Sequence, residues 1–102
     1  MIGLAMMLVG ASLPHTFVNG GQLYALCTGD ETQQRNCTSY LIGAVDYAVA
    51  QKVPICLPVG TQGRELRSVA TEYLLAQKVE WASVGADLAV AAFRKAYPCT
   101  KT

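Results

Sequence analysis

Histidine and charge are the scarcest features of this 102-residue sequence. The single histidine is His15, so the chain that follows it contains none. Without an imidazole, a Ser–His or Cys–His nucleophile is excluded from that part of the chain, and so is most metal catalysis. Charged residues make up 15% of the sequence and the formal net charge is +1, so bulk electrostatics does not favour nucleic acid. The sequence therefore predicts a protein with no catalytic residues, no cofactor and no metal.

Short motifs of metal, redox and phosphate sites are also missing. The four cysteines lie far apart, whereas zinc and redox sites favour C-x-x-C spacings. Gly60 and Gly63 do not form a phosphate loop, because a Walker lysine and a preceding strand are lacking. Asp30 and Glu31 are adjacent carboxylates at an expected helix start, where negative charge is favourable. None of these features predicts a reaction.

The N-terminal stretch is unusual because the first 29 residues contain no charged side chain. Residues 1–10 form an apolar run that is too short to span a bilayer but has the length of a signal-peptide core. Small residues near Ala11 suit a cleavage site, and Pro14 would end any helix begun earlier. We predict a signal peptide or leader remnant over residues 1–16 and a mature domain over 17–102. The alternative is a buried N-terminal helix.

Apolar residues recur at helical spacing in four segments, and no segment alternates as a strand would. The predicted fold is therefore all-α, a small bundle of about four helices. We expect Thr61 to be the N-cap of the third helix and Pro98 to end the fourth. The expected helices cover residues 21–27, 31–52, 62–77 and 82–97.

The second segment carries the longest apolar stripe, from Cys37 to Val49. Ile42 and Tyr47 lie beside this stripe, which predicts a wide apolar face on a central helix. Gly43 lies in the middle of the helix, where it costs about 1 kcal/mol relative to alanine. We expect a close helix crossing at that position.

The fourth segment is apolar on two sides, which predicts either full burial or a partner outside the chain. We interpret this pattern as a possible homodimer interface. On the third segment, Arg64 and Arg67 form a small basic spot that is expected to be solvated. Between the second and third segments, Pro54 and Pro58 exclude both helix and paired central strand, so an extended connector is expected.

An even number of cysteines in a short chain behind a secretory-looking leader predicts a disulfide framework. Three pairings are possible, and free buried thiols are the alternative if the chain stays in the cytosol. The local pairing, Cys27–Cys37 with Cys56–Cys99, requires the least distortion of the expected helices. In the chain-entropy model these bonds are worth roughly 3 and 4 kcal/mol, comparable to the stability of a small domain.

The order of several short motifs resembles the Rap/Tai family, small periplasmic immunity proteins of type VI secretion systems. The resemblance covers residues 17–99 and departs from the family in residues 77–80, where a proline is often found. The motifs that carry it are Gly21-x-Leu23-x-x-x-Cys27, Cys37-x-x-Tyr40-Leu41-x-Gly43, Ile55-Cys56-Leu57-Pro58, Tyr73-Leu74 and Phe93-x-x-x-Tyr97-Pro98-Cys99.

The resemblance implies an exported, often dimeric helical protein that binds a cell-wall amidase toxin and blocks its active-site groove. Carried over by position, the four cysteines are framework residues, whereas toxin-contacting residues do not carry over. Tyr40, Gly43, Pro58 and Pro98 match structural positions of the motif.

Two loops are the best candidates for entering a toxin groove. The first is the rigid connector near Leu57, and the second precedes the last helix and contains Trp81, although a core position for this tryptophan is favoured. The predicted partner-binding residues are Leu57, Gly60, Gln62, Lys78, Glu80 and Trp81.

Two other functions are compatible with an exported helical domain. A periplasmic acid-stress chaperone is one, but the low charge content argues against it. An envelope protein of unknown role, attached to the membrane only through an uncleaved leader, is the other.

Overall fold

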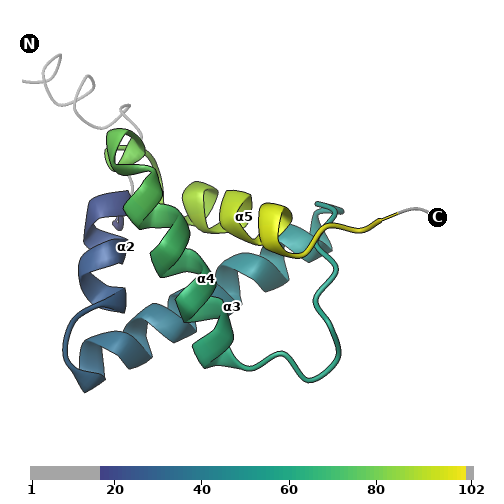
Figure 1. Cartoon of the computed structure of the whole chain (residues 1–102), viewed down its shortest axis with the longest axis horizontal. Helices are drawn as coiled ribbons and strands as arrows, with labels where there is room; N and C mark the ends of the chain where they lie inside the picture. The colour runs from purple at the N-terminus through teal and green to yellow at the C-terminus, as the bar shows by residue number, and fades with distance from the viewer. Residues whose placement is uncertain (1–16, 101–102) are drawn as a thin grey trace, which may run out of the picture.

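The computed structural model describes residues 17–100, so the predicted leader over residues 1–16 lies outside the described part. Within it, regular structure is helical, apart from one isolated antiparallel bridge between Asn19 and Val84. The all-α prediction is confirmed (Figure 1). The helices are α2 (Gly20–Cys27), α3 (Glu31–Ala50), α4 (Gly63–Ala76), the 3-10 turn η1 (Lys78–Glu80) and α5 (Gly85–Ala96). No described helix has the length and apolarity that a membrane crossing requires.

The first two helices begin at reciprocal caps that are encoded locally. The Gln22 N–H donates to the Asn19 side chain at 2.8 Å, and the Asn19 N–H donates back to the Gln22 amide oxygen at 2.9 Å. Asp30 and Gln33 repeat this arrangement at the start of α3. These pairs satisfy backbone donors that a helix start leaves without partners. At the other end of α3, Lys52 adopts a φ of 69°, which stops the helix before the expected residue 52.

Helix α3 contacts α2, α4 and α5, but each of these helices also contacts the other three, so the contacts do not single out α3 as the central helix. Its buried side chains form one narrow stripe, made of Cys37, Leu41, Val45 and Ala48. The prediction of a wide apolar face is wrong, since Ile42 and Tyr47 are 42% and 68% exposed. The other helices pack on this stripe and on neighbouring residues such as Thr38 and Tyr40, which leaves much of Ile42 and Tyr47 exposed.

The close helix crossing expected at Gly43 is also wrong. This glycine is exposed, and a Cβ added to it would meet no atom within 4 Å. Crossings occur instead where the chain has small residues at helix starts. A Cβ on Gly63 would come within 2.5 Å of the Thr38 methyl group, so α4 begins pressed against α3.

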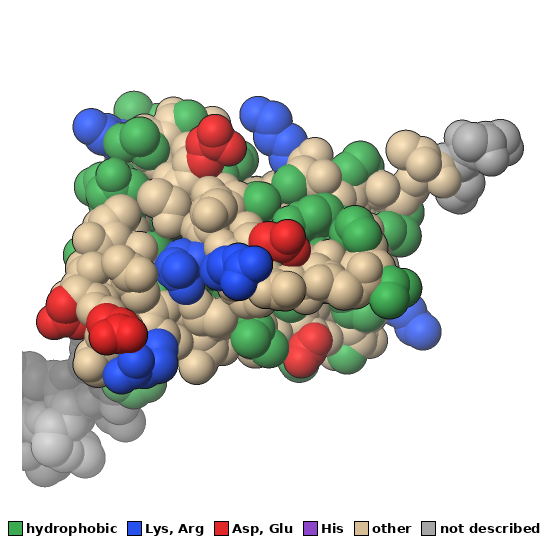
Figure 2. All heavy atoms as spheres, turned by 60° about the horizontal axis from the view of Figure 1, so that its bottom comes forward, with side chains coloured by type: hydrophobic (Ala, Val, Ile, Leu, Met, Phe, Trp, Pro, Cys, Tyr) green, Lys and Arg blue, Asp and Glu red, His purple; other side chains and the backbone are tan. Residues whose placement is uncertain are grey.

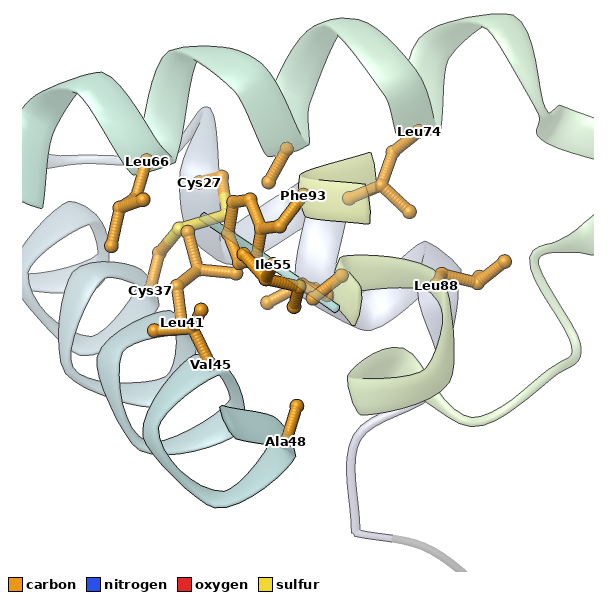
Figure 3. Packing of buried hydrophobic residues seen from close by; sticks show 13 residues of the cluster. Cys27, Cys37, Leu41, Val45, Ala48, Ile55, Leu66, Leu74, Leu88 and Phe93 are labelled. Atoms are coloured by element: carbon orange, nitrogen blue, oxygen red, sulfur yellow. A yellow bond between two sulfur atoms is a disulfide. The ribbon is translucent and has the colours of Figure 1, made fainter. Parts of the chain in front are cut away.

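The core lies between the four helices and is centred on Phe93, which is completely buried (Figure 3). Side chains from each helix and one from the connector, Ile55, converge on it. The Cys27–Cys37 disulfide belongs to the same cluster. Burial of apolar side chains contributes about 25 cal/mol per Å², so this shared cluster accounts for the association of the helices. Its members are Leu23, Cys27, Cys37, Leu41, Val45, Ala48, Ile55, Leu66, Ala70, Leu74, Leu88, Ala89 and Phe93.

The disulfide pairing is the favoured one. Cys27 bonds to Cys37 with a Cα–Cα distance of 5.0 Å, joining the end of α2 to the second turn of α3. Cys56 bonds to Cys99 with a Cα–Cα distance of 5.1 Å, joining the connector to the segment after α5. The first bond is in the core, whereas Cys56 is exposed and Cys99 is half-buried.

Helix α5 begins at Gly85, three residues later than expected. Residues 81–85 instead pair with the start of α2: the Gly20 N–H donates to the Ser83 carbonyl at 3.0 Å, and the Gly85 N–H donates to the Val18 carbonyl at 2.8 Å. The Gly85 N–H has one hydrogen to donate, so its bond to Val18 excludes the helical bond that a helix start at residue 82 would require.

Tyr40, a residue of α3, accepts a hydrogen bond at the start of α5, where no local side chain acts as a cap. The Ala86 N–H donates to the phenol oxygen of Tyr40. Burial raises the pKa of Tyr40, Ala86 opposes this rise, and the Asp87 carboxylate adds to it. Tyr40, which the family resemblance identifies as a structural residue, thus accepts a backbone N–H at the start of α5, where no local side chain acts as a cap.

Candidate functional site

The connector between α3 and α4 is fixed to the rest of the fold over its middle part. Ile55 is buried in the core, and Leu57 packs against the core while remaining partly exposed. The Cys56 N–H donates to the Tyr97 carbonyl at 2.9 Å, next to the disulfide that joins Cys56 to Cys99. The connector is neither helix nor strand, as expected, although the Ile55 N–H donates to the Val53 carbonyl across a tight turn at Pro54. It is held by a covalent bond, a hydrogen bond and a core side chain.

A tight turn follows, from Pro58 to Thr61. The Thr61 N–H and hydroxyl both donate to the Pro58 carbonyl, at 3.1 and 2.7 Å. Gly60 has a φ of 92°, a left-handed conformation that side chains disfavour. Val59 lies between these residues and is fully exposed, with a relative accessibility of 106%. The turn therefore presents one apolar side chain on a backbone that is fixed on both sides.

The predicted N-cap of α4 is wrong by one residue. Gln62 is the cap, and its N–H donates to the Glu65 carboxylate at 2.9 Å. The Thr61 hydroxyl instead donates to the Pro58 carbonyl inside the turn. The sequence signal for the correct cap was the polar Gln62-x-x-Glu65 spacing, which resembles a capping box.

An open groove of about 680 Å³ lies between this turn and the first half of α4. Tyr97 contributes to its wall, and its pKa is raised mainly by burial and further by the nearby Glu65 carboxylate. Figure 2 shows basic side chains beside an acidic one near the middle of one face of the molecule. The groove is lined by Pro58, Val59, Gly60, Thr61, Arg64, Glu65, Arg67, Ser68, Val69 and Tyr97.

The three charged residues of this groove differ in their contacts. Glu65 accepts the Gln62 N–H, so its carboxylate serves the helix start. Arg67 donates to the Thr38 hydroxyl at 2.9 Å and is half-buried. Arg64 is exposed and forms no ion pair within residues 17–100. The groove therefore has a net positive charge, with one guanidinium available to a partner.

The second candidate loop lies at the other end of α4 and has a structural role. The Trp81 indole N–H donates to the Leu74 carbonyl at 2.8 Å, and the ring stacks on Tyr24 with 5.0 Å between centroids. Trp81 is half-buried, so it is neither a full core residue nor an exposed anchor. Lys78, Val79 and Glu80 form the exposed 3-10 turn, where Val79 is 93% exposed.

The structure divides the predicted partner-binding residues into two groups. Leu57, Gly60 and Gln62 lie before α4, whereas Lys78, Glu80 and Trp81 lie after it. Fourteen helical residues separate the groups, a span of about 21 Å at 1.5 Å per residue. One narrow groove on a partner would therefore not receive both loops. Sequence reasoning did not select Val59, although its place between Pro58 and Gly60 in a pinned segment was the available signal.

The described residues offer no cluster of three or more His, Cys, Asp or Glu side chains that could hold a metal ion. What the connector end offers is shape and charge: an exposed apolar side chain, a shallow groove and an unpaired arginine. Such features suit contact with another macromolecule.

Comparison with known proteins gives one match. A family model described as Rap1a immunity proteins matches residues 19–99. The sequence matches no curated protein and no solved structure.

Proposed function

This chain belongs to the family of Rap1a immunity proteins, and we propose that it binds and inhibits a peptidoglycan amidase toxin of a type VI secretion system in the periplasm. The family match is the observation that carries the proposal, because it covers the whole helical domain from the α2 cap to Cys99. It agrees with the resemblance found in the sequence motifs. A toxin partner follows from the family, whereas the amidase and the secretion system are parts of the proposal.

The two disulfides support an exported location. Disulfides persist in oxidising compartments such as the periplasm and are rare in the cytosol. Both bonds of this chain join segments that the fold brings together, and no described cysteine is left unpaired. The apolar residues 1–10 are consistent with a secretory leader. We therefore place the mature domain, residues 17–102, in the periplasm.

Inhibition would be stoichiometric and non-catalytic. A protein that blocks a groove requires a fixed protruding surface and a few well-placed anchor side chains. The connector and its turn meet this requirement, because ordering them on binding costs little entropy.

The homodimer stays a prediction, and the core of the same chain accounts for much of the apolar pattern of α5 that suggested it. The apolar residues on both sides of α5 lie mostly in the core of the same chain, including Leu88, Ala89 and Phe93. Exposed apolar side chains on α3, such as Tyr47, are the better candidates. Sedimentation of the wild type and of Tyr47→Glu would check this, and a dimer unchanged by the substitution would exclude that face.

The proposed function is tested with the full chain, expressed with its own leader and recovered from the periplasm. The probe is a purified small amidase encoded beside this chain in its source genome. We expect a stable complex and loss of peptidoglycan hydrolysis at equimolar protein. No binding and no inhibition at micromolar concentration would refute the proposal for this chain.

A further inference from the structure

We propose that the connector end of α4 is the surface that contacts the toxin, with Val59 as its apolar anchor and Arg64 as its charged contact. This connector surface consists of residues 58–61 and Arg64. The inference rests on the proposed function and specifies its site. It also specifies the partner: a groove with a recess for one branched aliphatic side chain and a carboxylate at its rim.

Val59 lies exposed on the connector surface. A fully exposed valine is unfavourable in water, yet here the backbone on both sides is fixed around it. The Pro58 carbonyl accepts two bonds from Thr61, and the Cys56–Cys99 bond fixes the preceding residues. Burial of this side chain by a partner gains apolar contact without the cost of ordering a loop.

The charges of the groove are complementary to an acidic partner. Arg64 lies one helical position after Gly63, on the exposed side of the groove. The other two charges of the groove already have contacts, Glu65 with the Gln62 N–H and Arg67 with Thr38. An arginine prefers a carboxylate because its planar donors match the two oxygens. The partner chemistry that fits is therefore an acidic side chain beside an apolar recess.

The opposite end of α4 differs from the connector surface in charge and in structural role. The turn η1 also exposes a valine, Val79, but its flanking Lys78 and Glu80 carry opposite charges that cancel. The residues that follow this turn hold the start of α2, since the Trp81 and Ser83 carbonyls accept bonds from Gly21 and Gly20. This end therefore provides a structural junction and no net charge for a partner.

The two ends supply matched variants for the experiment. Val59→Asp and Val79→Asp make the same change at two highly exposed valines, and Arg64→Glu and Lys78→Glu reverse an exposed positive charge at each end. Each full-length variant is purified from the periplasm, and its fold is checked by circular dichroism. Its affinity for the same amidase is then measured by calorimetry, at low and high salt.

We expect Val59→Asp to raise the dissociation constant roughly 30-fold or more, as for a central anchor residue. Arg64→Glu should weaken binding roughly tenfold at low salt and less at high salt, because ions screen a charge at the rim. Val79→Asp and Lys78→Glu should bind like the wild type.

Other results would overturn the inference. Losses confined to the η1 variants, or no loss in any variant, would show that the connector surface is not the contact, while the proposed function stands. Equal losses at both ends would show that the contact is not specific to the connector surface, and would overturn the inference as well. A wild-type chain that neither binds nor inhibits the amidase would refute the proposed function, and this inference with it.

Discussion

At the scale of single residues, the surroundings of two helical glycines decide how their substitution by alanine would change the stability of the protein. Gly43 and Gly85 both lie in α-helices, and neither position is distinguished by periodicity alone. Gly43 faces open space, whereas a Cβ on Gly85 would lie 2.9 Å from the Val18 carbonyl oxygen. Sequence patterns locate a residue along a helix, but they do not give the distance to a segment elsewhere in the chain.

Gly43→Ala is therefore expected to stabilise the protein by about 0.5–1 kcal/mol, the usual helix preference for alanine over glycine. Chemical denaturation with circular dichroism checks this value. The matched control is Gly85→Ala, which should destabilise because the added methyl group meets backbone. A destabilised Gly43→Ala variant would indicate that another molecule approaches α3 at this position in solution.

Trp81→Phe separates a structural role from a binding role. The substitution removes the indole N–H that donates to Leu74 but keeps an aromatic ring opposite Tyr24. We expect a loss of about 1 kcal/mol in unfolding free energy, the usual value of one such bond. Amidase affinity should be unchanged, and a large loss of affinity with unchanged stability would assign Trp81 to the interface.

At the scale of elements, the starts of α2 and α3 could be predicted because each helix begins at a local cap. The start of α5 could not be predicted, because this helix has no local capping side chain. The capping boxes at the starts of α2 and α3 are formed by polar residues three positions apart in the sequence, Asn19 with Gln22 and Asp30 with Gln33. The start of α5 depends on acceptors from Val18 and Tyr40, which lie far earlier in the chain. No local pattern reports such contacts, so the boundary was placed three residues early.

The start of α5 also gives a pH dependence. The pKa of Tyr40 is raised in the folded protein, mainly by burial, so the unfolded chain loses this proton first as pH rises above the ordinary value of 10.0. The folded state then binds more protons than the unfolded state, and stability must fall as pH increases through that range. Below it, Tyr40 is protonated in both states and contributes no slope.

Thermal unfolding between neutral pH and the alkaline range checks this expectation, with ultraviolet absorbance used to follow tyrosine ionisation. Tyr40→Phe is the control, and its unfolding temperature should decline less steeply above pH 10.0 than that of the wild type. Parallel curves for the two proteins would contradict the role of Tyr40. Tyr97 has a pKa raised in the same direction and accounts for a remaining slope.

At the scale of the whole molecule, the fold class, the helix order and the disulfide pairing followed from the sequence, but the site followed only in part. Cysteine spacing and two prolines located the connector. They did not identify Val59 as its apex, because exposure in a turn depends on Gly60 and Thr61 closing the backbone. The sequence also gives no sign that the two candidate loops lie at opposite ends of α4.

The two disulfides are expected to differ in their response to reductant. Cys27 and Cys37 are 5% and 0% exposed, whereas Cys56 is exposed at the surface. Under mild reduction of the native protein, alkylation followed by peptide mass spectrometry should label Cys56 and Cys99 first, because exchange requires access to a sulfur. Circular dichroism should stay helical at that stage, and simultaneous labelling of all four cysteines would contradict this order.

If the protein is exported as proposed, the surface Cys56–Cys99 bond would couple its maturation to its proposed activity. Before export the cytosol would keep these thiols reduced, so a newly made chain would lack the tether that shapes its protruding turn. We therefore expect tight recognition of the toxin to arise only after oxidation, when immunity is required.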